Sequence, residues 1–193
     1  MRNSIKVSKF ELNQLGVSVA IFEAVLADLS LVPSLRVSKG VEGDTEYRLT
    51  VQRLVSDMTP PTEERSYYQP QNDHALAESA RRLIDAVTRS IQVRDIIGPG
   101  EIRRIQCNVL DPGDFIGSHD DFSANQLYSH TLVIGLSSDY DGGALSLHLP
   151  EGVLNVRPLR GDVIIFDSRV VHEIHAVESG RRRTLVGFVE SKS

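Results

Sequence analysis

Apolar residues recur at helical spacing in two stretches of the first half of the chain. In residues 8–31 and in residues 73–93 they fall every three or four positions, which predicts a helix over each range. Between these helices, residues 45–55 alternate polar and apolar side chains and include β-branched residues, so they predict a strand. Residues 57–72 contain three prolines and many polar residues. This composition predicts a connecting loop, which is also a candidate lid over a site.

The pattern changes at Glu101. Short apolar runs then alternate with Gly, Pro and Asp, and this spacing predicts seven short strands. The runs are residues 102–110, 130–136, 143–149, 153–156, 162–166, 171–177 and 183–189. Such a series is typical of an antiparallel sandwich or jelly roll. We therefore predict an α+β fold, mainly β, in which a double-stranded β-helix (jelly roll) carries the N-terminal helices on its major sheet.

The length of 193 residues fits a single domain. Within residues 1–193 we expect residues 1–100 to form a helical support with the lid, and residues 101–193 to form the jelly-roll core. The net charge is −5, so the chain has no general basic field of the kind that attracts nucleic acid. No nucleic-acid partner is therefore expected.

The single cysteine, Cys107, excludes an intramolecular disulfide and a cysteine-based zinc cluster, and it is consistent with a reducing compartment. The first 16 residues lack the apolar stretch of a signal peptide. No segment approaches the roughly 20 apolar residues that a membrane span needs. These features predict a cytoplasmic protein with no membrane partner.

Two histidines and a carboxylate are candidates for a metal site in the β region. In an extended strand, side chains at i and i+2 point the same way, so we expect His119 and Asp121 to face one point and Asp120 to point away. His119 and Asp121 would supply two of the three ligands of the 2-His-1-carboxylate triad that binds Fe(II). The second imidazole must come from a distant strand, where His172 and His175 are both candidates.

An arginine follows these histidines and has a role in the same chemistry. A 2-His-1-carboxylate triad leaves iron positions open for a bidentate 2-oxo acid and for O2. The remote carboxylate of such an acid must be neutralised, which Arg does well because its planar fork pairs with a carboxylate through two bonds. Arg182 follows His172 after the turn Glu178-Ser179-Gly180, so it is the candidate.

The stretch from Asn108 to Phe188 resembles the prolyl-hydroxylase-like branch of the Fe(II)/2-oxoglutarate-dependent dioxygenases. It has the H-x-D motif of that family at His119, the paired glycines at 142–143 before a strand, and then a G-D-x-x-x-F strand. From His172 onward it follows the pattern H-E-[VI]-x-x-V-x-x-G-x-R-x-x-L-x-x-[WF]. H-x-D alone recurs by chance, whereas the ordered set of motifs is specific.

The resemblance implies roles for individual residues. The metal ligands fall on His119, Asp121 and His172, and the arginine that binds 2-oxoglutarate falls on Arg182, so these four form the catalytic set. Thr131 matches a strand position that often helps to hold the same carboxylate of 2-oxoglutarate.

The resemblance also selects His172 over His175 as the distal ligand, because only His172 has the family's spacing to the arginine. The chain departs from the family at two tyrosine positions. The strand that contains Asn108 lacks the tyrosine usual before H-x-D, and Gly135 stands where a second tyrosine is common. Asn108 and Tyr128 are the candidates for co-substrate contacts in their place.

The implied activity is hydroxylation of an unactivated C–H bond. Fe(II) is the metal, 2-oxoglutarate and O2 are co-substrates, ascorbate is a reductant, and succinate and CO2 are released. A compact chain without an evident peptide-binding domain favours a small-molecule substrate, such as an amino acid or a natural-product intermediate. The first alternative is a hydroxylase of prolyl or other residues in a peptide or protein. A further alternative is a cupin-type metal-binding module or isomerase, since the same framework serves several functions.

Overall fold

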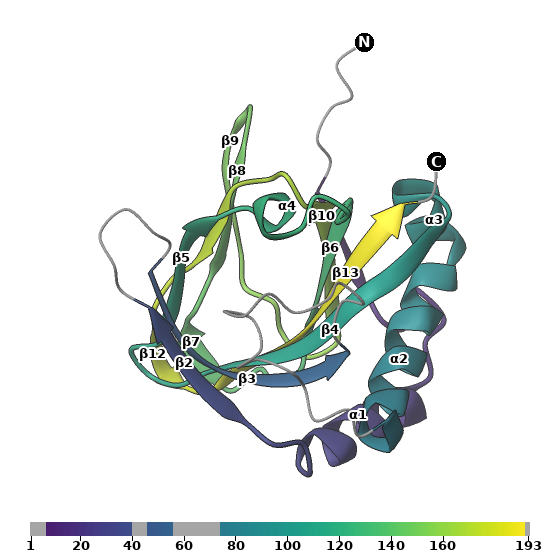
Figure 1. Ribbon diagram of the computed structural model, residues 1–193, viewed down its shortest axis with the longest axis horizontal. Helices are drawn as coiled ribbons and strands as arrows, with labels where there is room; N and C mark the ends of the chain where they lie inside the picture. Colours follow the sequence, from purple (N-terminus) through teal and green to yellow (C-terminus); the bar gives the residue numbers. More distant parts are fainter. Residues whose placement is uncertain (1–6, 40–45, 56–73, 192–193) are drawn as a thin grey trace.

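A computed structural model describes residues 7–39, 46–55 and 74–191 of the chain. They form a strongly curled antiparallel sheet with helices against one side of it (Figure 1). This architecture confirms the predicted double-stranded β-helix with N-terminal helices packed on its major sheet. Within the described ranges, no helix has both the length and the apolar character needed to cross a membrane. The predicted lid, residues 57–72, lies outside the described residues.

The helices are α1 (Val19–Leu29), α2 (His74–Arg89), α3 (Ile91–Ile97) and α4 (Asp121–Ala124). The strands are β1 (Ser8–Glu11), β2 (Leu35–Lys39), β3 (Tyr47–Val55), β4 (Gly100–Leu110), β5 (Phe115–His119), β6 (His130–Gly135), β7 (Tyr140–Gly142), β8 (Leu145–Leu149), β9 (Gly152–Val156), β10 (Asp162–Asp167), β11 (His172–Ile174), β12 (Val177–Gly180) and β13 (Arg182–Ser191). In the larger sheet the strands follow the order β1-β10-β6-β13-β4-β3-β5-β11-β8-β9, with β2 added on β3, while β12 and β7 pair separately.

The two faces of the curled sheet have different neighbours. Successive side chains of a strand point to opposite faces, so Leu185 and Val189 of β13 join one apolar core with Val25 of α1 and Leu83 of α2. The other face of β13 lines the interior of the barrel. Helices α1, α2 and α3 thus cover the outside of the β4–β13 region (Figure 1), and the cavity described below lies on the other face of these strands.

The predicted helix over residues 8–31 is wrong in its first half. Residues 8–11 form β1, which pairs antiparallel with β10 at the edge of the sheet. A turn then runs to Gly16, whose φ of +70° favours glycine. The helix begins only after Ser18, whose hydroxyl accepts a hydrogen bond from the Ala20 N–H as its N-cap. The apolar periodicity was misleading because Leu12 and Leu15 are buried in the turn rather than in a helix.

Other boundaries also differ from the predictions. The second predicted helix is two helices, because Ser90 separates α2 from α3. The predicted strand over residues 171–177 is likewise divided, into β11 and β12. The short strands β2 and β5 follow from pairing with β3 and were not predicted from the local sequence.

A buried carboxylate fixes the segment that leads into β5. Asp114 is buried, and it accepts hydrogen bonds from the guanidinium groups of Arg36 and Arg48 and, at 3.0 Å, from the N–H of Asp111. Burial by itself raises the pKa of Asp114, but the Arg36 hydrogen bonds and the Asp111 N–H outweigh it and leave the pKa below its ordinary 3.8. These contacts connect β2 and β3 to the start of β5.

Replacing Asp114 with asparagine should lower the free energy of unfolding at neutral pH by about 1–2 kcal/mol, because two charge-assisted interactions are lost. The pKa of Asp114 is lowered in the folded state, so its contribution is present at neutral pH and is lost as the pH falls through that lowered value. Urea unfolding should therefore show a difference between variant and wild type that shrinks below pH 3.8. A constant difference over that range would contradict this assignment.

Candidate metal centre and co-substrate pocket

The two histidines of the candidate triad lie on neighbouring antiparallel strands. His119 ends β5 and His172 begins β11, and the two residues are direct cross-strand partners. Their ring centroids are 4.2 Å apart. Directly opposite side chains on one face of a sheet are close enough to share a ligand, so strand pairing places two imidazoles at one point.

The carboxylate reaches the same point by a different route from the predicted one. Asp121 is not in a strand with His119, because β5 ends at His119 and Asp121 is the first residue of α4. Asp120 caps this short helix by accepting a hydrogen bond from the Ser123 N–H at 2.6 Å. The i, i+2 argument for a shared strand face was therefore wrong, although it predicted the meeting of the two side chains.

The three candidate ligand atoms form a compact group. The Nε2 atoms of His119 and His172 are 3.8 Å and 3.6 Å from the carboxylate oxygens of Asp121. One ligand atom from each residue lies within 4.8 Å of the other two. His175, the other candidate, is exposed, and its Nε2 is 2.6 Å from the Ser146 hydroxyl. The structure thus brings His172 to the triad and leaves His175 outside it.

Backbone carbonyls fix which nitrogen of each imidazole is available. Nδ1 of His119 is 2.8 Å from the Gly117 oxygen, and Nδ1 of His172 is 2.9 Å from the Val170 oxygen. A carbonyl only accepts, so each Nδ1 carries a proton and donates it, which leaves the Nε2 lone pair free in the neutral ring. Metal-binding histidines commonly have this arrangement.

The surroundings of His172 favour the neutral form that a metal requires. Burial lowers the pKa of His172, and neighbouring His119 lowers it further, while Asp121 acts in the opposite direction. The net direction is downward. At neutral pH the ring is therefore uncharged, as the donor set of a 2-His-1-carboxylate site demands.

Thr131 holds the carboxylate of the triad. Its hydroxyl donates to Asp121 at 2.6 Å and lies 3.0 Å from the hydroxyl of Ser168. The backbone oxygen of Ser168 also accepts from the N–H of Asp121 at 3.0 Å. The resemblance had placed Thr131 on the carboxylate of 2-oxoglutarate. In the structure its hydroxyl donates to the protein's own Asp121 carboxylate, and its contact with 2-oxoglutarate stays a prediction.

Arg182 lies in the same interior, fully buried. Its Nη1 donates to the hydroxyl of Thr184 at 3.2 Å, whereas its Nε and Nη2 have no hydrogen-bond partner among the described residues. Burial lowers its pKa to about 10, against the influence of the Tyr140 phenol, so the group remains a cation at neutral pH. A buried cation without an anion is costly. Its unpaired nitrogens therefore fit an incoming carboxylate.

The paired-glycine turn makes room for this arginine. A Cβ on Gly143 would lie 2.9 Å from Cδ of Arg182, and the φ of Gly143 is +60°. Tyr140 of the same turn donates its hydroxyl hydrogen to the Pro158 oxygen at 2.7 Å and contacts Arg182. Tyr140 was not predicted as a neighbour of the arginine, because its place there depends on how the turn packs.

The missing family tyrosines have a structural explanation in one case. A Cβ at Gly135 would lie 1.9 Å from the Leu159 oxygen, so the main chain fills the space of a side chain there. Asn108 lines the interior beside Thr184, its cross-strand partner, and remains a candidate contact for the co-substrate. Tyr128 does not line it, since its ring stacks on Phe188 with centroids 4.7 Å apart.

One cavity of about 860 Å³ contains both the candidate metal ligands and the buried arginine. His119, Asp121 and His172 line it, as do Thr131 and Arg182. The cavity therefore joins a candidate metal site to a buried cation.

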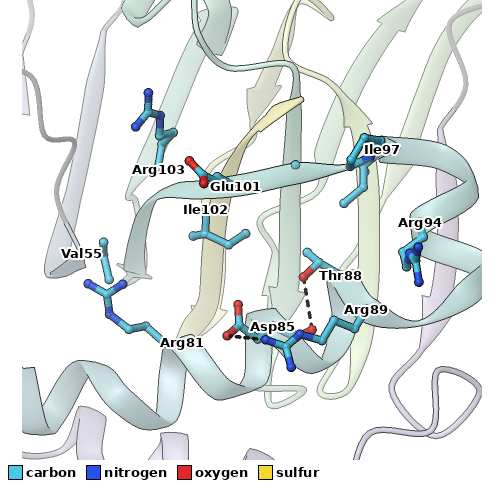
Figure 2. A pocket seen from close by; sticks show the side chains of 13 residues that line it. Val55, Arg81, Asp85, Thr88, Arg89, Arg94, Ile97, Glu101, Ile102 and Arg103 are labelled. Atoms are coloured by element: carbon cyan, nitrogen blue, oxygen red, sulfur yellow. Dashed lines mark hydrogen bonds and ion pairs between the residues drawn. The ribbon is translucent and has the colours of Figure 1, made fainter. Parts of the chain in front are cut away.

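A second cavity, of about 680 Å³, lies between α2, α3 and the start of β4 (Figure 2). Its arginines Arg81, Arg94 and Arg103 lie at separate edges and point in different directions, and Arg89 pairs with Asp85 at 3.8 Å (Figure 2). None of the described residues that line it is a histidine. These side chains do not converge on a ligand, so the first cavity is the candidate site.

The two threonines allow the metal and co-substrate contacts to be separated. Thr131→Val should weaken Fe(II) binding by about 10- to 100-fold, because a hydrogen bond that orients a metal ligand is lost. Thr184→Val removes the contact to Arg182 and should weaken 2-oxoglutarate binding with little effect on the metal. Anaerobic titrations of each ligand would measure both effects. Equal losses of both ligands in both variants would contradict the assignments.

Residues 105–190 match the family described as the 2OG-Fe(II) oxygenase superfamily. The matched range includes all three residues of the triad and Arg182. The β region of the chain is therefore similar to the 2OG-Fe(II) oxygenase superfamily. This superfamily uses Fe(II), 2-oxoglutarate and O2, and the His-Asp-His donor set and the unpaired guanidinium both fit these groups.

Individual members of the superfamily are similar over different lengths. A PKHD-type hydroxylase of Idiomarina loihiensis is 28% identical over 113 residues, which cover 56% of this chain and 52% of the relative. The chain thus matches about half the length of this curated relative. An oxidoreductase of the 2OG-Fe(II) oxygenase family from Burkholderia pseudomallei is 25% identical, with a TM-score of 0.79 over 97% of this chain and 86% of that one. A prolyl-4-hydroxylase from Pseudomonas putida shares the fold, with a TM-score of 0.60 at 18% identity over 97% of this chain and 94% of that one.

Proposed function

We propose that this oxygenase hydroxylates an unactivated C–H bond of a small molecule, such as an amino acid or a natural-product intermediate, and releases succinate and CO2. The observation that carries the proposal is the shared cavity. In it a 2-His-1-carboxylate group and a fully buried guanidinium with two unpartnered nitrogens face the same space. The first matches the iron site of this oxygenase class, and the second matches a dicarboxylate co-substrate.

Each residue has a defined task in this proposal. The Nε2 atoms of His119 and His172 and a carboxylate oxygen of Asp121 would hold Fe(II). Bound Fe(II) supplies the redox chemistry that couples oxidative decarboxylation of 2-oxoglutarate to C–H hydroxylation, with one oxygen atom of O2 entering each product. Arg182, oriented by Thr184, binds the remote carboxylate and fixes the orientation of the co-substrate.

The apolar side chains of the cavity contribute by limiting access of water. Leu49, Val51 and Val133 line it together with Leu145 and Ile174. Exclusion of water strengthens the charge pairing at Arg182. It also favours one orientation of a C–H bond next to the metal.

A protein substrate is the second candidate. Curated relatives carry the name PKHD-type hydroxylase, and a prolyl-4-hydroxylase shares the fold. These similarities favour a prolyl or other residue within a polypeptide. The small-molecule proposal draws instead on the described residues, which are used by one β-helix and its supporting helices.

Succinate release measures the proposed reaction. The iron-loaded protein should convert 2-oxoglutarate to succinate, and one of a panel of free amino acids should stimulate this conversion and gain one oxygen atom by mass. Stimulation only by proline-containing peptides would favour the second candidate. Absence of 2-oxoglutarate binding in the iron-loaded protein would instead favour a cupin-type module or isomerase.

A further inference from the structure

A row of polar side chains runs along the cavity on β4. Arg104, Gln106 and Asn108 alternate along the strand, so they share a face, and all three line the cavity. Nη2 of Arg104 donates to the Gln106 amide oxygen at 2.6 Å, and the Gln106 amide donates to Asn108 at 2.8 Å. The neighbouring strand adds Arg53, which is the cross-strand partner of Gln106 and also lines the cavity.

The sheet register places Arg104 at the metal end of this row. Arg104 is directly opposite Phe188 of β13, and Phe188 is directly opposite Thr131 of β6. The Arg104 guanidinium carbon lies 5.5 Å from the centroid of the Phe188 ring. Thr131 is the residue that holds Asp121. Two strand spacings, about 10 Å, therefore separate the backbone of Arg104 from that of the residue bonded to the triad.

Arg104 and Arg182 have separate positions in the cavity. Arg182 is hydrogen-bonded to Thr184, whereas Arg104 lies over Phe188. Thr184 and Phe188 are four residues apart on β13, which corresponds to about 13 Å along the strand. A 2-oxoglutarate molecule held between the triad and Arg182 would thus leave the Arg104 end of the cavity free for another ligand.

The positive charge of Arg104 at this end of the cavity is not paired with a carboxylate of the described residues. In the described part of the chain, the contacts of Arg104 are an amide oxygen and an aromatic ring, and no carboxylate lies within ion-pair distance of its guanidinium. The acidic residues that line the cavity are otherwise engaged, since Asp120 caps α4 and Asp121 belongs to the triad. A planar guanidinium is well suited to a carboxylate.

We propose that Arg104 binds a carboxylate of the primary substrate, so that the substrate is a free carboxylic acid held at the end of the cavity away from Arg182. This inference rests on the proposed function and makes its substrate class specific. It also bears on the two candidates above, because the main-chain carboxyl group of an internal residue of a polypeptide is an uncharged amide and could not pair with Arg104 as an anion.

Small acids and their amides test the subsite directly. The probes are acetate, butyrate and benzoate, each paired with its primary amide, added to protein loaded with Mn(II) and saturating 2-oxoglutarate. Paramagnetic relaxation of the probe protons reports binding close to the metal. For at least one pair, the acid should bind the wild type about tenfold or more tightly than the amide, since a charge-assisted pair is much stronger than a neutral contact.

Two matched variants locate the effect. Arg104→Gln should reduce the binding of that acid at least about tenfold and leave the amide unchanged. Arg103→Gln should leave the binding of the acid and of the amide unchanged. Arg103 pairs with Glu190 at 2.5 Å and does not line the cavity that contains Arg104. Thermal unfolding of both variants checks that the fold is kept.

Two outcomes would overturn the proposal. In the first, none of the acids binds the wild type more tightly than its amide does. In the second, acid binding is unchanged in Arg104→Gln. Failure of the proposed function is a different result. It would appear as absence of 2-oxoglutarate binding to the metal-loaded wild type, and the acid and amide pairs can still be compared without 2-oxoglutarate in that case.

Discussion

Asp121→Ala should abolish the proposed hydroxylation and weaken Fe(II) binding by at least about 100-fold. Removing a residue that only supports a metal ligand weakens metal binding by about 10- to 100-fold, so removing a ligand itself should cost at least as much. The carboxylate is the only anionic donor of the triad, and its oxygens lie 3.8 Å and 3.6 Å from the two imidazole Nε2 atoms. Two neutral imidazoles cannot replace its charge. Anaerobic Fe(II) titration would measure the affinity, and succinate release would measure the activity.

The neighbouring aspartate provides the control. Asp120→Ala removes the N-cap of α4 and should cost about 1 kcal/mol of folding free energy. It should keep most of the Fe(II) affinity, because Asp120 contacts Ser123 rather than the triad. Similar losses of Fe(II) binding in the two variants would mean that the effect comes from α4 and not from a metal ligand.

Arg182→Met should have two opposite effects. It should reduce 2-oxoglutarate affinity by about 100-fold or more, because a buried charge-assisted pair is lost, while Fe(II) binding remains. It should also raise the free energy of unfolding of the ligand-free protein by about 1–3 kcal/mol. The physical reason is that an apolar side chain of similar length replaces a buried cation whose Nε and Nη2 lack partners among the described residues.

The adjacent Arg181 serves as the matched control. Its side chain is exposed and forms a surface ion pair with Asp111 at 2.6 Å, so Arg181→Met should change both stability and 2-oxoglutarate affinity little. Titration with 2-oxoglutarate and urea unfolding would be measured on both variants. Retained 2-oxoglutarate affinity in Arg182→Met would contradict the proposed role of the arginine.

The β-helix could be predicted from sequence because its signal is local. Alternation of apolar residues and turn-forming residues marks β4, β6, β8, β9, β10 and β13 within the chain itself. The strand β1 lacked such a signal, since it is four residues long and acquires its conformation by pairing with β10, more than 150 residues later. Short strands of this kind depend on tertiary pairing more than on intrinsic preference.

Part of the site could likewise be predicted from the local sequence, whereas the rest depends on tertiary packing. The motifs predicted which histidines and which carboxylate would meet, but the helical position of Asp121 follows from the cap at Asp120. The contact between Thr131 and Asp121 depends on the packing of β6 against α4, and the motif assigned Thr131 to another carboxylate. The position of Tyr140 beside Arg182 likewise arises only when the paired-glycine turn packs on β13.

A crystal structure of the protein with Fe(II) and 2-oxoglutarate, grown without oxygen and measured at the iron absorption edge, tests the central claim most directly. We expect one strong anomalous peak bonded to Nε2 of His119, Nε2 of His172 and an Asp121 oxygen, with a 2-oxoglutarate carboxylate against Arg182. An iron peak elsewhere, or a co-substrate that does not reach the Arg182 guanidinium, would contradict it.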